Sequence, residues 1–177
     1  YLRGGVVTMT IETLIGSGSG SQGYCELTAG GQLEGQRIQV GSYGSGQFVQ
    51  TGGDATFTGL VTIGHSAGSL GSWTMKDGNF TAKGSNDIWV GYRSTGQFEQ
   101  TGGHLTVGRD LSLGWDTTGI GTFALSGGTV QTNSITVGRL GHGTMRIQGG
   151  NASISSGLYQ QNAQSELISE VDPSGLS

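Results

Sequence analysis

The residues best suited to chemistry in this sequence are aromatic and cationic side chains that recur one position after a glycine. Tyr92, Trp115 and Arg139 each directly follow the glycine that closes a short apolar segment. His65 stands at the same place one repeat earlier, and Trp89 lies in the apolar segment before Tyr92. Aromatic faces beside cations suit stacking against a sugar ring or contact with another protein. The spacing predicts an interaction stripe along one corner, formed by His65, Trp89, Tyr92, Trp115 and Arg139.

A structural alternative explains the same side chains, because rings stacked along a corner would also cover glycine-rich backbone. Catalysis has less support. Glycoside hydrolysis by the usual route needs two carboxylates placed together, and no position of the repeat supplies such a pair. Asp54 and His104 share an outward position but lie two repeats apart, about 9.6 Å at the strand spacing, which is too far for contact. We therefore predict no enzyme and no catalytic residues.

Metal and cofactor sites are not expected either. His65, His104 and His142 occupy different places in the repeat, and no Cys or His pair has ligand spacing. Three acids, Asp87, Asp110 and Asp116, are interpreted as solvated corner residues. Cys25 is the only cysteine, so it cannot form an internal disulfide, and we expect a buried thiol.

Composition points to a β-rich fold with many tight turns. The 177 residues include 37 glycines and one proline, and only 11% are charged. The glycines follow no three-residue period, which excludes collagen, and regularly spaced apolar residues argue against disorder. A net charge of -4 argues against a nucleic-acid partner. No apolar run is long enough to predict a transmembrane segment.

Internal repeats organise the whole chain. A glycine-containing corner recurs seven times at steps of 22 to 26 residues, and a bulky residue stands four positions before most corners. Two outward asparagines, Asn79 and Asn151, follow such corners within glycosylation sequons and are expected at equivalent positions. The corners are Gly4-Gly5, Gly30-Gly31, Gly52-Gly53, Asp77-Gly78, Gly102-Gly103, Gly127-Gly128 and Gly149-Gly150.

Each repeat is expected to form three short strands. In the first strand Phe98 and Gln100 face inward and Glu99 faces outward, by the two-residue period of a strand. The second strand follows the corner, and the third has the pattern apolar-x-apolar-Gly. One repeat buries little alone, whereas stacked repeats pile like side chains inside. We predict an all-β fold, a right-handed parallel β-helix of about seven coils of 22–26 residues with three short strands per coil. A propeller blade would need about 40 residues or more.

The chain is expected to be one domain over residues 1–177, and its ends differ from its middle. Residues 1–22 form an atypical first coil whose last part, residues 16–22, is Gly/Ser-rich and looks like a linker. Regular coils cover residues 23–156. Residues 157–177 are expected to form a terminal coil and an exit, with a turn at Asp172-Pro173-Ser174-Gly175. No convincing cap is evident at either end, so we expect a longer chain or a polymer.

Over residues 23–177 the repeats resemble those of bacterial secreted β-solenoid proteins, namely autotransporter-passenger-like and PEP-CTERM-associated repeat proteins. The similar units are Gly-Gln-Phe-x-Gln-Thr-Gly-Gly, Ile-Trp-Val-Gly-Tyr and Gly-Thr-Phe-x-Leu-Ser-Gly-Gly. The closing residues Ser165-Glu166-Leu167 and Ser174-Gly175-Leu176 look like the strand after their last repeat. The resemblance implies an extracellular or cell-surface setting and brings no active-site residues with it.

These features lead to three functional hypotheses. The first is an extracellular structural protein that self-associates end to end into a fibre, matrix or surface layer. The second is an adhesin-type module that contacts glycan through the aromatic stripe. The third is a β-helix carbohydrate-active enzyme. Partners are therefore expected to be further copies of the chain or an extracellular glycan.

Overall fold

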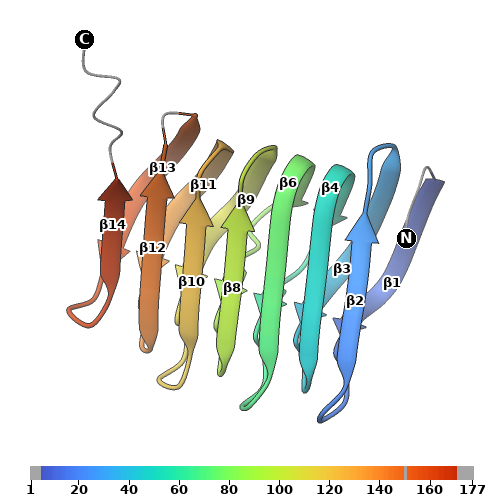
Figure 1. Ribbon diagram of the computed structural model, residues 1–177, viewed down its shortest axis with the longest axis horizontal. Coiled ribbons are helices and arrows are strands. Elements are labelled where there is room, and N and C mark those ends of the chain that lie inside the picture. Colours follow the sequence, from blue (N-terminus) through green and yellow to red (C-terminus); the bar gives the residue numbers. More distant parts are fainter. Residues whose placement is uncertain (1–4, 150, 171–177) are drawn as a thin grey trace.

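The computed structural model describes residues 5–149 and 151–170, and in these ranges the chain forms strands and turns with no helix. The strands pair in parallel with their counterparts one repeat away, and the chain winds as a β-solenoid of about seven turns (Figure 1). The predicted parallel β-helix is confirmed. The strands are β1 (Gly5–Ile15), β2 (Gln22–Leu27), β3 (Gly31–Val40), β4 (Ser45–Phe57), β5 (Val61–Ile63), β6 (Leu70–Ala82), β7 (Ile88–Val90), β8 (Thr95–Gln100), β9 (His104–Leu113), β10 (Ile120–Leu125), β11 (Gly128–Val137), β12 (His142–Gln148), β13 (Ala152–Gln161) and β14 (Glu166–Glu170).

Three columns of parallel strands run along the solenoid. The first column consists of β2, β4, β6, β8, β10, β12 and β14. The second contains the first parts of β1, β3, β9, β11 and β13 and the last parts of β4 and β6. The third contains β5 and β7 together with the last parts of β1, β3, β9, β11 and β13. In Figure 1 the chain rises along the front strands and descends behind them as it advances from the N-terminal to the C-terminal end, so the winding is right-handed.

The interior is built from side chains that stack on their counterparts in neighbouring coils. The first-strand column runs from Cys25 at one end to Leu167 at the other, with Phe48, Trp73, Phe98, Phe123 and Met145 between them. The rings of Phe48 and Trp73 stack with centroids 4.1 Å apart, and those of Trp73 and Phe80 with centroids 4.2 Å apart. Cys25 is half-buried rather than buried as expected, because no described strand lies beyond β2 in this column.

Two glutamines interrupt the apolar interior, and the side-chain NH2 group of each donates to corner backbone while its Oε1 is buried without a hydrogen-bond partner. The side-chain amide of Gln50 donates to the carbonyls of Gly53 and Asn79, at 3.1 and 2.9 Å. Gln100 repeats this arrangement two coils later, with donor distances of 3.2 Å to Gly103 and 3.2 Å to Thr129. Met75 separates the two amides in the column. Each amide therefore links its own corner to the next coil.

The corners need glycine because neighbouring coils approach too closely for a side chain. A Cβ on Gly41, whose φ is 72°, would lie 2.2 Å from the carbonyl oxygen of Leu70 in the next coil. Residues 16–22, the Gly/Ser-rich stretch interpreted as a linker, form a corner of the same kind. Gly16 also has a φ of 72°, and the Ser21 amide donates to the Gly18 carbonyl at 2.9 Å.

The register of the last coil differs from the prediction. Gly128 pairs with Ala152 and Thr129 pairs with Ser153, because the last corner is two residues longer than the corner before it. Asn151 therefore does not share the position of Asn79, which pairs with Asp54 and His104. The predicted turn at 172–175 and the closing residues 174–176 lie outside the described residues, as does the second residue of the 149–150 corner.

Candidate interaction site

The structure brings together all five residues of the predicted stripe. The Tyr92 ring lies between His65 and Trp89, with centroids 5.2 and 5.1 Å away. Trp89 stacks on Trp115 with centroids 4.0 Å apart and an angle of 20° between the ring planes. The guanidinium of Arg139 lies 3.7 Å from the centroid of the Trp115 ring. The aromatic stripe is therefore one continuous stack that spans four coils.

Backbone hydrogen bonds continue around the corner and hold these side chains in register. The amide of Tyr92 donates to the carbonyl of Gly64 at 2.9 Å, and the amide of Trp115 donates to that of Gly91 at 3.0 Å. Trp89 faces outward from the third-strand column and pairs with Thr62 and Ser112. Both of these small neighbours are fully buried although they also face outward. The stripe therefore covers the sheet beneath it.

The stack uses the ring faces that a sugar would need. Trp115 has Trp89 on one side and the Arg139 guanidinium within cation–π distance. Tyr92 contacts His65, Trp89 and the Arg93 guanidinium, which lies 5.0 Å from its centroid. Sugar stacking requires a free aromatic face, whereas these rings pack against one another. The geometry favours the structural interpretation of the stripe, in which the rings cover the corner.

The surroundings shift the pKa of two groups, His65 in the stripe and Asp116 beside it. Asp116 accepts a hydrogen bond from Nε of Arg93 at 3.0 Å, and this bond, with those from Thr117, lowers the pKa of Asp116. Burial lowers the pKa of His65 and outweighs the opposing influence of Glu12. The His65 imidazole is therefore neutral at pH 7. Its Nδ1 lies 3.1 Å from the Ser66 hydroxyl.

The fold keeps Asp54 and His104 two coils apart, as predicted from their spacing. Asn79 lies between Asp54 and His104 and donates to Asp54 at 2.7 Å. His104 contacts the Thr129 hydroxyl at 2.6 Å. Residues 5–149 and 151–170 contain no cluster of three or more side chains that could hold a metal ion.

The carboxylate of Asp87 differs from the prediction of a solvated corner residue. Asp87 is only 3% exposed and is not a solvated corner residue. It accepts a hydrogen bond from Nε of Arg109 at 2.7 Å, a second bond from that guanidinium, and one from the Asp110 amide at 3.2 Å. All three donors lie in the next coil. Asp87 therefore links two neighbouring coils by hydrogen bonds. These bonds also supply the partners that a buried carboxylate needs.

Comparisons with protein-family models, with curated proteins and with solved structures gave no match. Within the described part of the chain, no helix has the length and apolar character to cross a membrane.

Proposed function

We propose that this chain is an extracellular structural protein whose copies stack end to end into a fibre, matrix or surface layer. The supporting observation is that exposed apolar side chains gather at the two ends of the solenoid. Among residues 5–149 and 151–170, twelve large hydrophobic side chains are highly exposed, and eight of them lie in the terminal strands, five in β1 and β2 and three in β13 and β14. They are Val6, Met9, Ile11, Leu14, Tyr24, Leu158, Tyr159 and Leu167.

The strand order makes the two ends complementary. The N-terminal end presents β1 and β2 as edge strands, and the C-terminal end presents β13 and β14. Both pairs belong to the same three columns. Edge strands carry unpaired backbone groups that favour pairing with another chain. A second copy whose β1 and β2 lie against β13 and β14 would continue every column.

Continuing the columns gives compatible side-chain neighbours. Leu167 would stack on Cys25 of the next copy, at the end of the column that contains Trp73. Ile154 would stack on Val7, in the column that contains Leu33. The acidic residues do not oppose one another, because Glu166 would meet Tyr24 and Glu26 would meet Ile168. Such a contact is head-to-tail and does not close on itself, so it produces filaments.

The extracellular setting rests on the resemblance to secreted repeat proteins. The alternative, a glycan-binding module that uses the aromatic stripe, has weaker support because the rings of the stripe occupy one another's faces.

A second thiol at the C-terminal end tests the proposed contact. In continued register, Cys25 and a cysteine at position 167 lie about 4.8 Å apart at their Cα atoms, within the range for a disulfide. Oxidation of Leu167→Cys should therefore give a ladder of multimers on a non-reducing gel, which a reductant collapses. Burial raises the pKa of the Cys25 thiol. The oxidation is therefore carried out at mildly alkaline pH, where more of the reactive thiolate is present.

Two controls separate end-to-end stacking from random collision. Leu167→Cys combined with Cys25→Ser has one thiol and should stop at dimers. Ile120→Cys places an exposed thiol on a lateral corner, so it should give no ladder. Folded Leu167→Cys protein that forms no ladder, or an equal ladder from Ile120→Cys, would overturn the proposal.

A further inference from the structure

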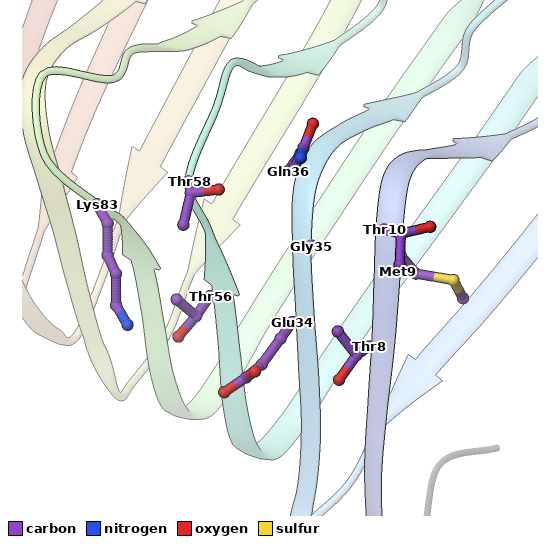
Figure 2. Close-up of a pocket in the computed structure, with 9 residues that line it drawn as sticks. All are labelled: Thr8, Met9, Thr10, Glu34, Gly35, Gln36, Thr56, Thr58 and Lys83. Carbon is purple, nitrogen blue, oxygen red and sulfur yellow. The ribbon is translucent and has the colours of Figure 1, made fainter.

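A polar groove lies on the outer face of the second-strand column, away from the aromatic stripe. One cavity, of about 260 Å³, is lined by residues of β1, β3 and β4 together with Thr58 and Lys83, which directly follow β4 and β6 (Figure 2). A second cavity, of about 360 Å³, is lined by residues of β3, β4 and β6 alone. Glu34 and Thr56 line both cavities, so the two form one groove across successive coils. Its main polar residues are Gln32, Glu34, Asp54, Thr56, Asn79 and Lys83.

The charged groups of the groove are available to a ligand. Glu34 pairs in register with Thr56, and Figure 2 shows Glu34 and Lys83 on opposite sides of Thr56. Neither Glu34 nor Lys83 has a side-chain hydrogen bond or ion pair within the described part of the chain. Asp54 uses Oδ1 to accept a hydrogen bond from Asn79. The groove thus presents the Glu34 carboxylate and the Lys83 ammonium with no partner to displace, beside an Asp54 carboxylate that is hydrogen-bonded to Asn79.

This arrangement matches a chain of sugar hydroxyls. Each hydroxyl both donates and accepts hydrogen bonds, so one ligand can satisfy Glu34, Asp54 and Lys83 together. Hydrogen bonds to charged groups are stronger than those between neutral groups. The polar positions recur at the strand spacing of about 4.8 Å, which suits a linear polymer with regularly repeated hydroxyls. A polyanion would be repelled by Glu34 and Asp54.

We propose that the polar groove binds a neutral linear polysaccharide that lies across β3, β4 and β6. This goes beyond end-to-end assembly and does not depend on it. It also places any glycan contact on the second-strand face, where Glu34 and Lys83 have no hydrogen-bond or ion-pair partner among the described residues, rather than on the aromatic stripe, where ring faces are occupied.

Affinity electrophoresis tests the proposal directly. Native gels containing a linear β-glucan, a galactomannan or a xylan are compared with gels containing polygalacturonate and with gels lacking polymer. At least one neutral polysaccharide should retard the protein, and polygalacturonate should not. The protein is assayed as the full chain. Absence of retardation by all three neutral polymers, or retardation only by polygalacturonate, would overturn the proposal.

Matched variants locate the binding site. Thr56→Leu fills the groove with apolar bulk at the residue shared by both cavities and should lower affinity at least about tenfold, the equivalent of one charge-assisted hydrogen bond. Thr106→Leu is its control, because Thr106 lies two coils further along the same column and lines neither cavity. Glu34→Gln keeps the shape and should weaken binding about fivefold, the difference between a charged and a neutral hydrogen bond. Equal losses in Thr56→Leu and Thr106→Leu would contradict the assignment.

Discussion

The middle coils and the terminal coils use the same three strands, but only the middle coils are covered on both sides. Trp73, in the middle of the first-strand column, is fully buried beside Phe48 and Phe98. Leu167, the last described residue of that column, is 45% exposed. Both side chains face the interior. Burial therefore depends on neighbours along the solenoid axis as much as on position within a coil, and the proposed stacking would bury the side chains that the ends leave exposed.

The largest expected difference comes from truncating this column in the middle and at its end. Trp73→Ala should lower the free energy of unfolding by about 3–5 kcal/mol, because it leaves a cavity between stacked rings. Leu167→Ala should cost less than about 1 kcal/mol in unstacked protein, since little burial is lost. Urea unfolding monitored by circular dichroism at low protein concentration measures both. Similar costs for the two variants would contradict the comparison.

A corner glycine gives a second contrast. A Cβ on Gly96 would lie 2.1 Å from the carbonyl oxygen of Ile63, so Gly96→Ala should destabilise the fold by about 3 kcal/mol. Ser165 takes the corresponding place in the last coil and accepts a hydrogen bond from the Gly143 amide at 3.0 Å. Ser165→Gly should cost only about 1 kcal/mol, the value of that bond. Thermal unfolding midpoints rank the two variants, and the reverse order would break the comparison.

Buried side-chain hydrogen bonds should contribute more to stability in the middle of the solenoid than at its C-terminal end. Gln50→Met removes the donor to the Gly53 and Asn79 carbonyls and should cost about 1–3 kcal/mol. Ser169→Met is the matched change at the exposed C-terminal end of the same column and should stay within about 0.5 kcal/mol. Denaturant midpoints at equal protein concentration measure both changes. A Gln50→Met variant as stable as the parent would show that these amides are dispensable.

The smallest expected effect is a dependence of stability on pH at the stripe. Burial lowers the pKa of folded His65 below that of the unfolded chain, so the folded state binds fewer protons. Stability from this site is present above about pH 6.5 and is lost as the pH falls toward the folded pKa. His65→Gln should flatten the change in melting temperature between pH 7 and pH 5. A pH dependence in His65→Gln as large as in the parent protein would contradict the assignment.

The fold could be predicted from the sequence because each coil repeats the same physical requirements. Corners such as Gly41 admit no side chain, and the first strands alternate buried and exposed residues as Phe98, Glu99 and Gln100 do. These constraints act within one coil, so a single sequence reveals them. The spacing also predicted that the five stripe residues gather, because residues at one position of the repeat become neighbours along the axis.

Features that depend on contacts between coils could not be predicted in the same way. The predicted register between β11 and β13 was wrong for two reasons. Exposed residues such as Ser153 show little apolar pattern, and glycine spacing does not reveal the longer corner before them. Asp87 looked solvated because its partner Arg109 lies in the next coil. The polar groove was not predicted because Glu34 and Lys83 are unremarkable alone, and the cavity that joins them depends on the surface shape of three strands and of the residues that follow β4 and β6.

Electron microscopy of the purified protein across a range of concentrations tests end-to-end stacking most directly. The account predicts rods of constant width that lengthen with concentration in steps of about 34 Å, seven strands at about 4.8 Å each. Dispersed particles of single-copy length at high concentration would contradict it.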